Sequence, residues 1–304
     1  MIKSNFITSV FQKYLINKDI RNLKSKTTYY FIFRVIRKFL AKDIIVNIYN
    51  FKIFGSINKN KTSYFLLKKC EFGDQHELST IKKFSRKNKI FFIDCGCNYG
   101  FYSFYTASLS KNNLVFSVEA SKKTSKEFLK NFKLNNFQKI KFKNNAISSI
   151  DNNNISFNES ENDWESSQTH NKFDNYAVTK ISTLKIDTLV KNVYLGDYLT
   201  MLKLDIEGNE MNALKGATEF IKNTSPFIII EISKYIFEKK INIEYLKNFL
   251  QNFNYSIYSI YKKKQKIEEI MNKLNNLKDK YKTIGNYYLI KNSSKTLEDF
   301  ISDE

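Results

Sequence analysis

Two glycines stand four residues apart behind a short apolar run that ends in an acid, in a chain with only eight glycines among 304 residues. The stretch reads FFIDCGCNYGF, and its candidate ligand-binding residues are Asp94, Gly96, Asn98 and Gly100. A strand that ends in Asp and turns through G-x-x-x-G into a helix presents free backbone N–H groups and leaves room for a ligand. Ligands of open parallel sheets bind at the carboxyl ends of strands. The stretch therefore predicts a site for a nucleotide-like ligand, although a tight, closely packed turn would explain the same glycines.

The glycine spacing separates two classes of ligand. A dinucleotide fold uses G-x-G-x-x-G, which lets a pyrophosphate approach the backbone. Here Cys97 lies between the two glycines, and the carboxylate of Asp94 would repel phosphate. A ligand with an amino-acid cation fits better, and S-adenosylmethionine is such a ligand. A dinucleotide-dependent oxidoreductase is therefore disfavoured.

Two later strand ends offer further ligand contacts. The second predicted strand ends in SVEAS, where Glu119 is followed by Ala120. A carboxylate there can accept both hydroxyls of a ribose, although a strand-terminal Glu is by itself more often solvated. The third predicted strand closes with Asn145 and Ala146, an amide and a small residue that would bound an adenine ring.

A second cluster of charged residues lies in the stretch LKLDIEGNE. Asp205 and Glu207 follow the fourth predicted strand, which in a doubly wound sheet lies beside the first. We expect Lys203 to offset the acids rather than to act as a catalyst. Glu210 is accounted for as a negative charge at a helix N-terminus, an interpretation that suits Asp205 poorly because Asp205 precedes the turn.

The pattern of apolar residues predicts strands that alternate with helices. Seven strands are predicted, at 90–94, 114–119, 140–147, 199–205, 227–232, 255–261 and 286–291. Helical spacing predicts helices at 76–87, 122–135 and 209–222, and an inserted helix within 262–283. Near-continuous apolar strands separated by helices indicate a doubly wound α/β fold, with a mostly parallel sheet covered on both faces. The polar stretch 148–185 is expected to pack near the opening of a site.

These stretches and their order resemble the FkbM-type family of S-adenosylmethionine-dependent methyltransferases. The matching pieces are IDCGCNYGFYS (93–103), VEAS (118–121), NAIS (145–148), STLKIDTL (182–189), LKLDIEGNEMNALKGA (202–217) and FIIIEI (227–232). The resemblance covers about residues 70–232, and K-x-D-x-E-G-x-E is its specific part. It implies a class I, Rossmann-like methyltransferase fold with S-adenosylmethionine as cofactor. It also implies transfer of the sulfonium methyl group to an acceptor, commonly a hydroxyl of a sugar or of a natural product.

An alcohol acceptor must lose its proton to a base or be polarised by a metal ion. Asp205 is expected to touch the cofactor and to act as that base, or to hold Mg²⁺ together with Glu231 at the end of the adjacent strand. His170, in the polar stretch, is a third catalytic candidate. Trp164 and Glu207 are expected to bind the acceptor, Trp164 by stacking on a sugar ring or else by anchoring its loop. The expected activity is O-methylation of a sugar in a surface glycan or lipid-linked polysaccharide.

The first fifty residues carry ten Lys or Arg and two Asp, a formal charge of +8. Apolar residues at helical spacing predict basic amphipathic helices there, followed by a hairpin built from 45–55 and 62–70. We expect a basic helical and hairpin cap over residues 1–69 and a methyltransferase domain over 70–304. Basic amphipathic helices can contact an anionic membrane, here through residues 1–45, although they are more often the half-buried faces of a cap.

The formal charge of +20 suggests a polyanionic partner, but lysine is spread along most of the chain. No specific nucleic acid is expected, because a nucleic-acid surface would concentrate Arg and Lys with aromatics on one face. A nucleic-acid methyltransferase, and a non-catalytic module that binds a membrane surface or a partner, remain the alternatives. Three cysteines without zinc-type spacing indicate buried thiols in a reducing compartment. With no secretory signal and no apolar run near the ~20 residues that span a bilayer, we expect a cytoplasmic protein, or one peripheral at the inner membrane surface.

Overall fold

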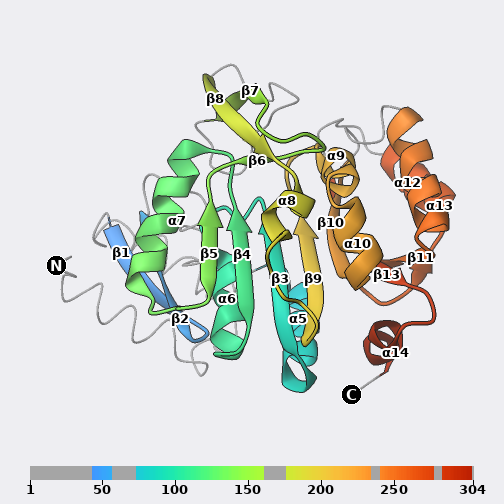
Figure 1. Cartoon of the computed structure of the whole chain (residues 1–304), viewed down its shortest axis with the longest axis horizontal. Coiled ribbons are helices and arrows are strands. Elements are labelled where there is room, and N and C mark those ends of the chain that lie inside the picture. Colours follow the sequence, from blue (N-terminus) through green and yellow to red (C-terminus); the bar gives the residue numbers. More distant parts are fainter. Residues whose placement is uncertain (1–42, 57–72, 161–175, 234–239, 277–282, 303–304) are drawn as a thin grey trace, which may run out of the picture.

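The computed structural model describes residues 43–56, 73–160, 176–233, 240–276 and 283–302. Its largest element is an eight-stranded sheet with the strand order β12-β11-β13-β10-β9-β3-β4-β5 (Figure 1). In that order the strands are Lys264–Gln265, Tyr255–Ser259, Thr283–Lys291, Phe227–Ser233, Tyr198–Leu204, Lys89–Cys95, Leu114–Val118 and Ile140–Lys143. All seven predicted strands contribute to it, and the two-residue β12 makes an eighth, so the predicted count of seven is too low.

The five strands β10, β9, β3, β4 and β5 run parallel, and β13, β11 and β12 complete the sheet with antiparallel pairings. The chain first builds outward from β3 through β4 to β5. It then returns to the other side of β3 and builds β9 and β10. The strand order therefore reverses between β3 and β9, and this reversal is where an open α/β sheet binds its ligand.

Helices cover both faces of the sheet, because its central strands are apolar on both sides. On β3, Phe91 belongs to one core and its neighbour Phe92 to the other. One core includes residues of α5 (Gln75–Lys87), α6 (Phe101–Leu109), α7 (Lys122–Leu134) and α14 (Lys295–Ile301). The other includes residues of α8 (Ile186–Val190), α9 (Glu210–Lys215), α10 (Thr218–Thr224), α12 (Lys240–Asn252) and α13 (Ile267–Asn275). The predicted doubly wound α/β architecture is confirmed.

Two predicted elements differ from those observed. The helix predicted at 209–222 is two helices, α9 and α10, because the chain breaks at Gly216, where an added Cβ would lie 2.2 Å from the backbone oxygen of Ser148. The strand predicted at 140–147 stops at Lys143. Its last part becomes β6 (Ala146–Ile147), which joins β8 (Tyr176–Leu184) and β7 (Asn154–Ser160) in a separate sheet of order β6-β8-β7. This small sheet is the predicted polar stretch, and in Figure 1 it lies above the carboxyl ends of β4 and β5.

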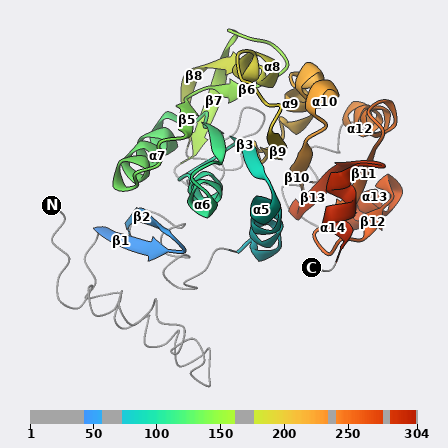
Figure 2. The same cartoon turned by 60° about the horizontal axis from the view of Figure 1, so that its bottom comes forward.

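The N-terminal hairpin is present, but both of its strands come from the first predicted strand. β1 (Asp43–Ile48) pairs with β2 (Phe51–Ser56) across a two-residue turn that starts at Tyr49, whose φ is 49°. The hairpin lies beside α7 (Figure 2), where the Phe54 N–H donates to Asn131 over 2.7 Å. The second predicted hairpin strand, at 62–70, and the predicted basic helices lie outside the described residues. The described part of the chain contains no helix long and apolar enough to cross a membrane.

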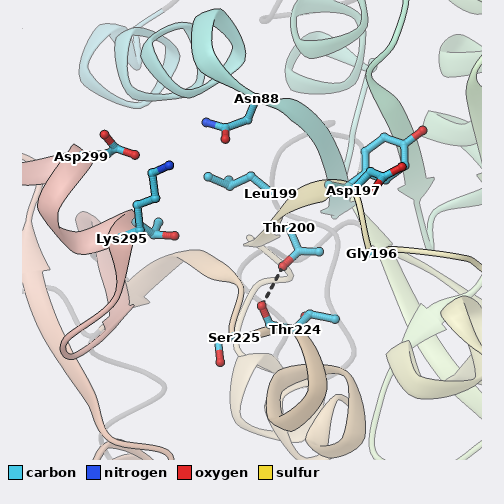
Figure 3. A pocket seen from close by; sticks show the side chains of 11 residues that line it. Asn88, Gly196, Asp197, Leu199, Thr200, Thr224, Ser225, Lys295 and Asp299 are labelled. Carbon is cyan, nitrogen blue, oxygen red and sulfur yellow. Dashed lines mark hydrogen bonds between the residues drawn. The ribbon is translucent and has the colours of Figure 1, made fainter.

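A pocket of about 330 Å³ opens at the amino ends of the strands, away from the strand-order reversal described above (Figure 3). Its lining combines the residues before and at the start of β9 with the C-terminal helix α14, including Asp197, Thr200, Lys295 and Asp299. Thr200 donates to the backbone oxygen of Thr224 in its wall. None of the predicted site residues that the structure describes lines this pocket.

Two glycines with left-handed backbone allow a direct test of the loop packing. Gly96 has a φ of +78°, and an added Cβ would lie 1.8 Å from the backbone oxygen of Asp205. Gly285 has a φ of +98° and open space around it. We expect Gly285→Ala to lower the free energy of unfolding by about 1–2 kcal/mol, the cost of the backbone conformation alone. Gly96→Ala should cost clearly more, because the loops after β3 and β9 must also separate.

Urea unfolding of both variants measures this difference, with Gly73→Ala as the control because nothing lies within 4 Å of its added Cβ. Equal losses for Gly96→Ala and Gly285→Ala would show that the two loops are not in contact.

Candidate active site

The tips of β3 and β9 meet at the reversal point of the sheet. Asp94 is paired in register with Lys203, and the Asp205 N–H donates to the backbone oxygen of Cys95 over 3.2 Å. The Gly96 backbone packs directly on the Asp205 backbone. The requirement for glycine at position 96 therefore comes from contact between two loops, so the closely packed turn explains this residue without a ligand.

Gly100 has a similar explanation. It precedes α6 with a φ of +89°, and an added Cβ would lie 2.4 Å from Phe104 and 2.8 Å from Phe128. Asn98, between the glycines, also has left-handed backbone, with a φ of 50°. This conformation turns the Asn98 N–H toward the tip of β4, where it donates to Glu119 Oε2 over 2.9 Å. The turn thus brings its backbone donors to the next strand, at the edge where the ligand was predicted.

Glu119 connects the loop after β3 with the start of α7. Its carboxylate accepts from the N–H of Asn98 through one oxygen and from the N–H of Ser121 through the other, both over 2.9 Å. Burial raises the pKa of Glu119 to about 7 despite these two donors. Each carboxylate oxygen can accept more than one hydrogen bond, so this geometry leaves acceptor capacity for a ribose diol.

Asp94 lies beneath the loop rather than on its open side. It is 0% exposed, and its Oδ2 accepts from Ser103 over 2.6 Å. Its Oδ1 has no hydrogen-bond partner among the described residues, and burial raises the pKa of the carboxyl. The predicted ligand contact of Asp94 stays a prediction, and the carboxylate is fully buried. The carboxylate contributes negative charge below the binding edge.

Lys203 supplies the positive charge among these acids. Its side chain is 3% exposed, its Nζ lies 2.7 Å from Asp205 Oδ2, and the Tyr102 ring centre lies 4.6 Å from the Nζ. Burial by itself would lower the pKa of Lys203, but the carboxylates of Asp205 and Asp94 raise it above its usual value, so the ammonium stays charged. The prediction that Lys203 offsets the acidic cluster agrees with this geometry.

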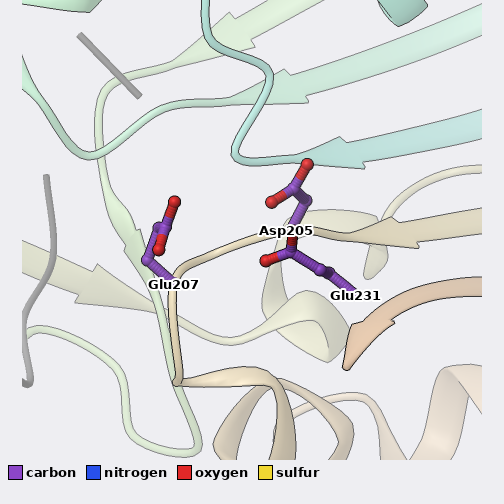
Figure 4. A group of neighbouring side chains, drawn as sticks. All are labelled: Asp205, Glu207 and Glu231. Carbon is purple, nitrogen blue, oxygen red and sulfur yellow. The ribbon is translucent and has the colours of Figure 1, made fainter. Parts of the chain in front are cut away.

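Three carboxylates converge beyond this ion pair. Asp205 and Glu207 follow β9, Glu231 belongs to β10, and one oxygen from each lies within 4.8 Å of the others (Figure 4). Glu207 has left-handed backbone, with a φ of 54°, and Gly208 follows with a φ of 105°. Burial, followed by the charges of Asp205 and Glu207, raises the pKa of Glu231 well above its usual range. The structure thus brings together the predicted catalytic pair and the predicted acceptor-binding Glu207.

Glu210 fixes the turn that carries these acids. Its Oε1 accepts from the N–H groups of Ile206 and Gly208, over 3.0 and 3.2 Å. The side chain is 0% exposed, and burial raises its pKa to about 7. Glu210 therefore stabilises the turn that precedes α9 and not the first turn of the helix. This explains why the motif combines a terminal Glu with a glycine two residues earlier.

Several site residues were not predicted. Asp74 stands at the start of α5 and accepts from the Tyr102 hydroxyl over 2.7 Å, and burial raises its pKa. Glu77, one turn further along α5, is buried and accepts from Asn286 over 2.8 Å. Asn286 on β13 is paired in register with Glu231. A Gly-Asp pair before a helical run was the only sequence signal for Asp74, and nothing local marked Glu77 or Asn286.

The remaining predicted residues divide into two groups. Asn145 donates to the backbone oxygen of Ser182, and Ala146 is buried in β6, so both stabilise the small sheet. Ala120 is half-buried and packs beside this sheet. Trp164 and His170 lie outside the described residues. His76, the other imidazole in the sequence, is exposed on α5 and packs edge-on against Tyr261.

Comparisons with known proteins identify a family and several similar solved structures. The family model of the methyltransferase FkbM domain matches residues 94–280. Among solved structures, FkbM from Methylobacillus flagellatus KT is 19% identical with a TM-score of 0.39, and the match covers 74% of this chain and 52% of that one. The chain thus spans about half the length of that protein. TYW2 from M. jannaschii, solved in complex with AdoMet, is 14% identical with a TM-score of 0.40, covering 82% and 87%. A search of curated proteins found no match.

The mostly parallel sheet reverses its strand order where the acid-lined loops meet, as expected for the class I, Rossmann-like fold that the sequence predicts. Because the family model covers more than half of the chain, the protein belongs to the FkbM methyltransferase family. The family resemblance inferred from the sequence is confirmed.

The raised pKa of Glu210 has a measurable consequence for stability. A folded-state pKa of about 7 against a usual value of 4.5 means that the folded protein binds this proton more tightly. The protonated carboxyl of Glu210 therefore contributes fully to the free energy of unfolding below pH 4.5, and this contribution is lost as the pH rises through 7. Glu210→Gln keeps an acceptor for the two N–H groups but does not titrate. Between pH 5 and pH 8 we expect the stability of the variant, relative to the wild type, to improve by about 2–3 kcal/mol.

Urea unfolding at the two pH values gives this difference, and Glu127→Gln on the exposed side of α7 is the control. Parallel pH profiles for wild type and Glu210→Gln would contradict the assignment of a buried, proton-retaining carboxyl at the turn.

Proposed function

We propose that this methyltransferase transfers the methyl group to a hydroxyl of a sugar, in a surface glycan or a lipid-linked polysaccharide. The observation that carries the proposal is the convergence of Asp205, Glu207 and Glu231 at the tips of β9 and β10, beside the loop after β3. A hydroxyl is a poor nucleophile at neutral pH, so its methylation requires a base or an activating cation next to the methyl group. Carboxylates gathered at this place suit either role.

Residues of the loops after β3, β4 and β9 would bind the cofactor and align the acceptor with it. S-adenosylmethionine supplies a methyl group on a sulfonium, which is already a good leaving group. Glu119 would accept the ribose hydroxyls, and the Gly96–Gly100 loop would line the cofactor with backbone, with Ala120, Asn145 and Ala146 near the adenine. Holding acceptor oxygen, carbon and sulfur in line is then the main contribution of the protein to the rate.

The charge balance of the site favours a cationic ligand. Lys203 faces several acids, and the site carries the carboxyls of Asp74, Asp94, Glu119, Asp205, Glu207, Glu210 and Glu231. A sulfonium or an ammonium placed there would favour the ionised form of Glu231, which burial and neighbouring charge disfavour in the empty site. Asp205 or Glu231 could then take the proton of the acceptor hydroxyl.

The same three carboxylates also fit a divalent cation. Mg²⁺ prefers oxygen ligands and is commonly held by one or two carboxylates, which Asp205 and Glu231 would provide, with Glu207 as a third donor. The ion would polarise the acceptor hydroxyl and lower the pKa of its proton. In the sequence, Trp164 and His170 remain candidates for stacking on the sugar and for the base, and cytoplasmic location remains a prediction.

Calorimetric titration with S-adenosylhomocysteine tests the cofactor site. We expect Glu119→Ala to weaken binding by about 30- to 100-fold, because it removes a two-pronged, charge-assisted hydrogen bond worth about 2–3 kcal/mol. Glu127→Ala, eight residues further along on α7, should bind as the wild type does. Equal affinities for wild type and Glu119→Ala would contradict the assignment of Glu119 to the ribose. No heat from wild type with either S-adenosylmethionine or S-adenosylhomocysteine would contradict the whole cofactor site.

Mass spectrometry of surface polysaccharide tests the acceptor. In a strain that lacks the gene, we expect a sugar residue to lose one methyl increment. The purified protein with S-adenosylmethionine should restore the increment on the extracted polysaccharide, and a chelator in the reaction separates the metal-assisted from the carboxylate-only scheme. Unchanged polysaccharide in the deletion strain would contradict a glycan acceptor.

A further inference from the structure

The outward face of α7 carries a dense row of positive charge. The segment from Lys122 to Lys143 contains eight lysines and one acid, Glu127, a formal charge of +7 in 22 residues against +20 for all 304. All eight lysines are exposed. About a third of the excess charge of the chain therefore lies at one end of the sheet, formed by α7 and β5.

The helix orders five of these lysines into one stripe. At 100° per residue, the lysines of α7 fall within an arc of about 100°. The opposite side of the helix is buried and packs on the sheet through Thr124, Ser125, Phe128 and Asn131. The only large apolar side chain that borders the stripe and is exposed is Leu129, at 40%. We call this face the α7 stripe: Lys122, Lys123, Lys126, Lys130 and Lys133.

The charges that face the stripe do not neutralise it. Glu127 pairs with Lys130, and Glu159 on β7 accepts from the backbone N–H groups of Lys122 and Lys123 at the helix start. Lys52 on β2 adds an exposed cation, with its backbone bonded to Asn135 just after the helix. Among the described neighbours the stripe therefore stays strongly positive.

The other three lysines, two on β5 and one just before it, have a different explanation. Lys141 lies over Phe116, whose ring belongs to the core on the other face of the sheet from α7. Lys139 lies just before β5 and Lys143 at its end, and exposed lysines along an edge strand prevent pairing with a second sheet. The edge accounts for these residues but not for the α7 stripe, which lies on a helix and touches the hairpin where Lys130 lies over the Phe54 ring.

We propose that the α7 stripe docks the protein on an anionic lipid surface. The stripe is convex and about 16 Å long, since a helix rises 1.5 Å per residue, so it suits a flat partner rather than a groove. Its cations are all lysines, point charges that suit a diffuse field of headgroups, whereas phosphate or base recognition favours the fork of arginine. Leu129 can enter the apolar boundary of such a surface.

Docking through α7 would bring the site to the lipid surface. The helix begins at Lys122, three residues after Glu119, and Ser121 both caps the helix and donates to that carboxylate. If the proposed function holds, this arrangement suits an acceptor sugar carried on a membrane lipid. Lipid binding itself does not depend on methyl transfer.

Vesicle sedimentation with a matched pair of variants tests the proposal. The stripe variant is Lys123→Glu/Lys126→Glu/Lys133→Glu, which spares Lys130 because it pairs with Glu127. The control is Lys82→Glu/Lys222→Glu/Lys263→Glu, three exposed lysines on other elements, with the same change in net charge. With phosphatidylcholine vesicles that contain phosphatidylglycerol, at low salt, we expect the stripe variant to bind about tenfold more weakly or worse and the control less than about twofold more weakly.

Wild type should not bind vesicles of phosphatidylcholine alone, and both variants should bind S-adenosylhomocysteine as the wild type does, which separates this proposal from the cofactor site. The proposal is overturned if wild type does not bind the anionic vesicles, or if both variants lose binding equally. It is also overturned if the stripe variant instead loses binding to single-stranded RNA while vesicle binding is unchanged.

Discussion

The binding edge of this protein depends on one buried ion pair and the loop contact beside it. Lys203 lies near the end of β9, in register with Asp94 on β3 and two residues before Asp205. Its ammonium pairs with Asp205, interacts with the charge of Asp94 and lies over the Tyr102 ring. Both partners of the pair lie at the end of β9, and removal of Asp205 would leave the buried ammonium of Lys203 without its nearest carboxylate, which is costly at a buried site. The contact of Gly96 with the Asp205 backbone, and the hydrogen bond from the Asp205 N–H to Cys95, join this tip to the end of β3.

This arrangement fixes the charge of the site independently of the rest of the chain. The protein is strongly basic, yet the edge where β3, β4 and β9 end is lined by acids, several of which have raised pKa values because they are buried. Such an edge favours a cation inside, while the lysines outside favour an anionic surface. The net charge of the sequence therefore reflects the basic surface of the molecule and does not reveal that the site is acidic.

The sequence allowed prediction of what depends on local pattern. Near-continuous apolar runs predicted the seven long strands, and the K-x-D-x-E-G-x-E stretch predicted that Asp205 and Glu207 would share one edge with Glu231. What it could not supply depends on distant contacts. The break at Gly216 reflects the backbone of Ser148, and the end of β5 reflects pairing of β6 with β8. Asn286 meets Glu77 across 209 residues, so no local pattern could reveal their bond.

We expect the tips of β3, β4 and β9 together to hold the adenosyl cofactor. Hydrogen–deuterium exchange with and without S-adenosylhomocysteine tests it most directly, because it locates the ligand on the backbone without knowledge of the acceptor. We expect slower exchange in three separate segments, 94–103, 118–121 and 203–210. Protection confined to the opposite edge, around 196–200 and 295–299, or no protection at saturating ligand, would contradict it.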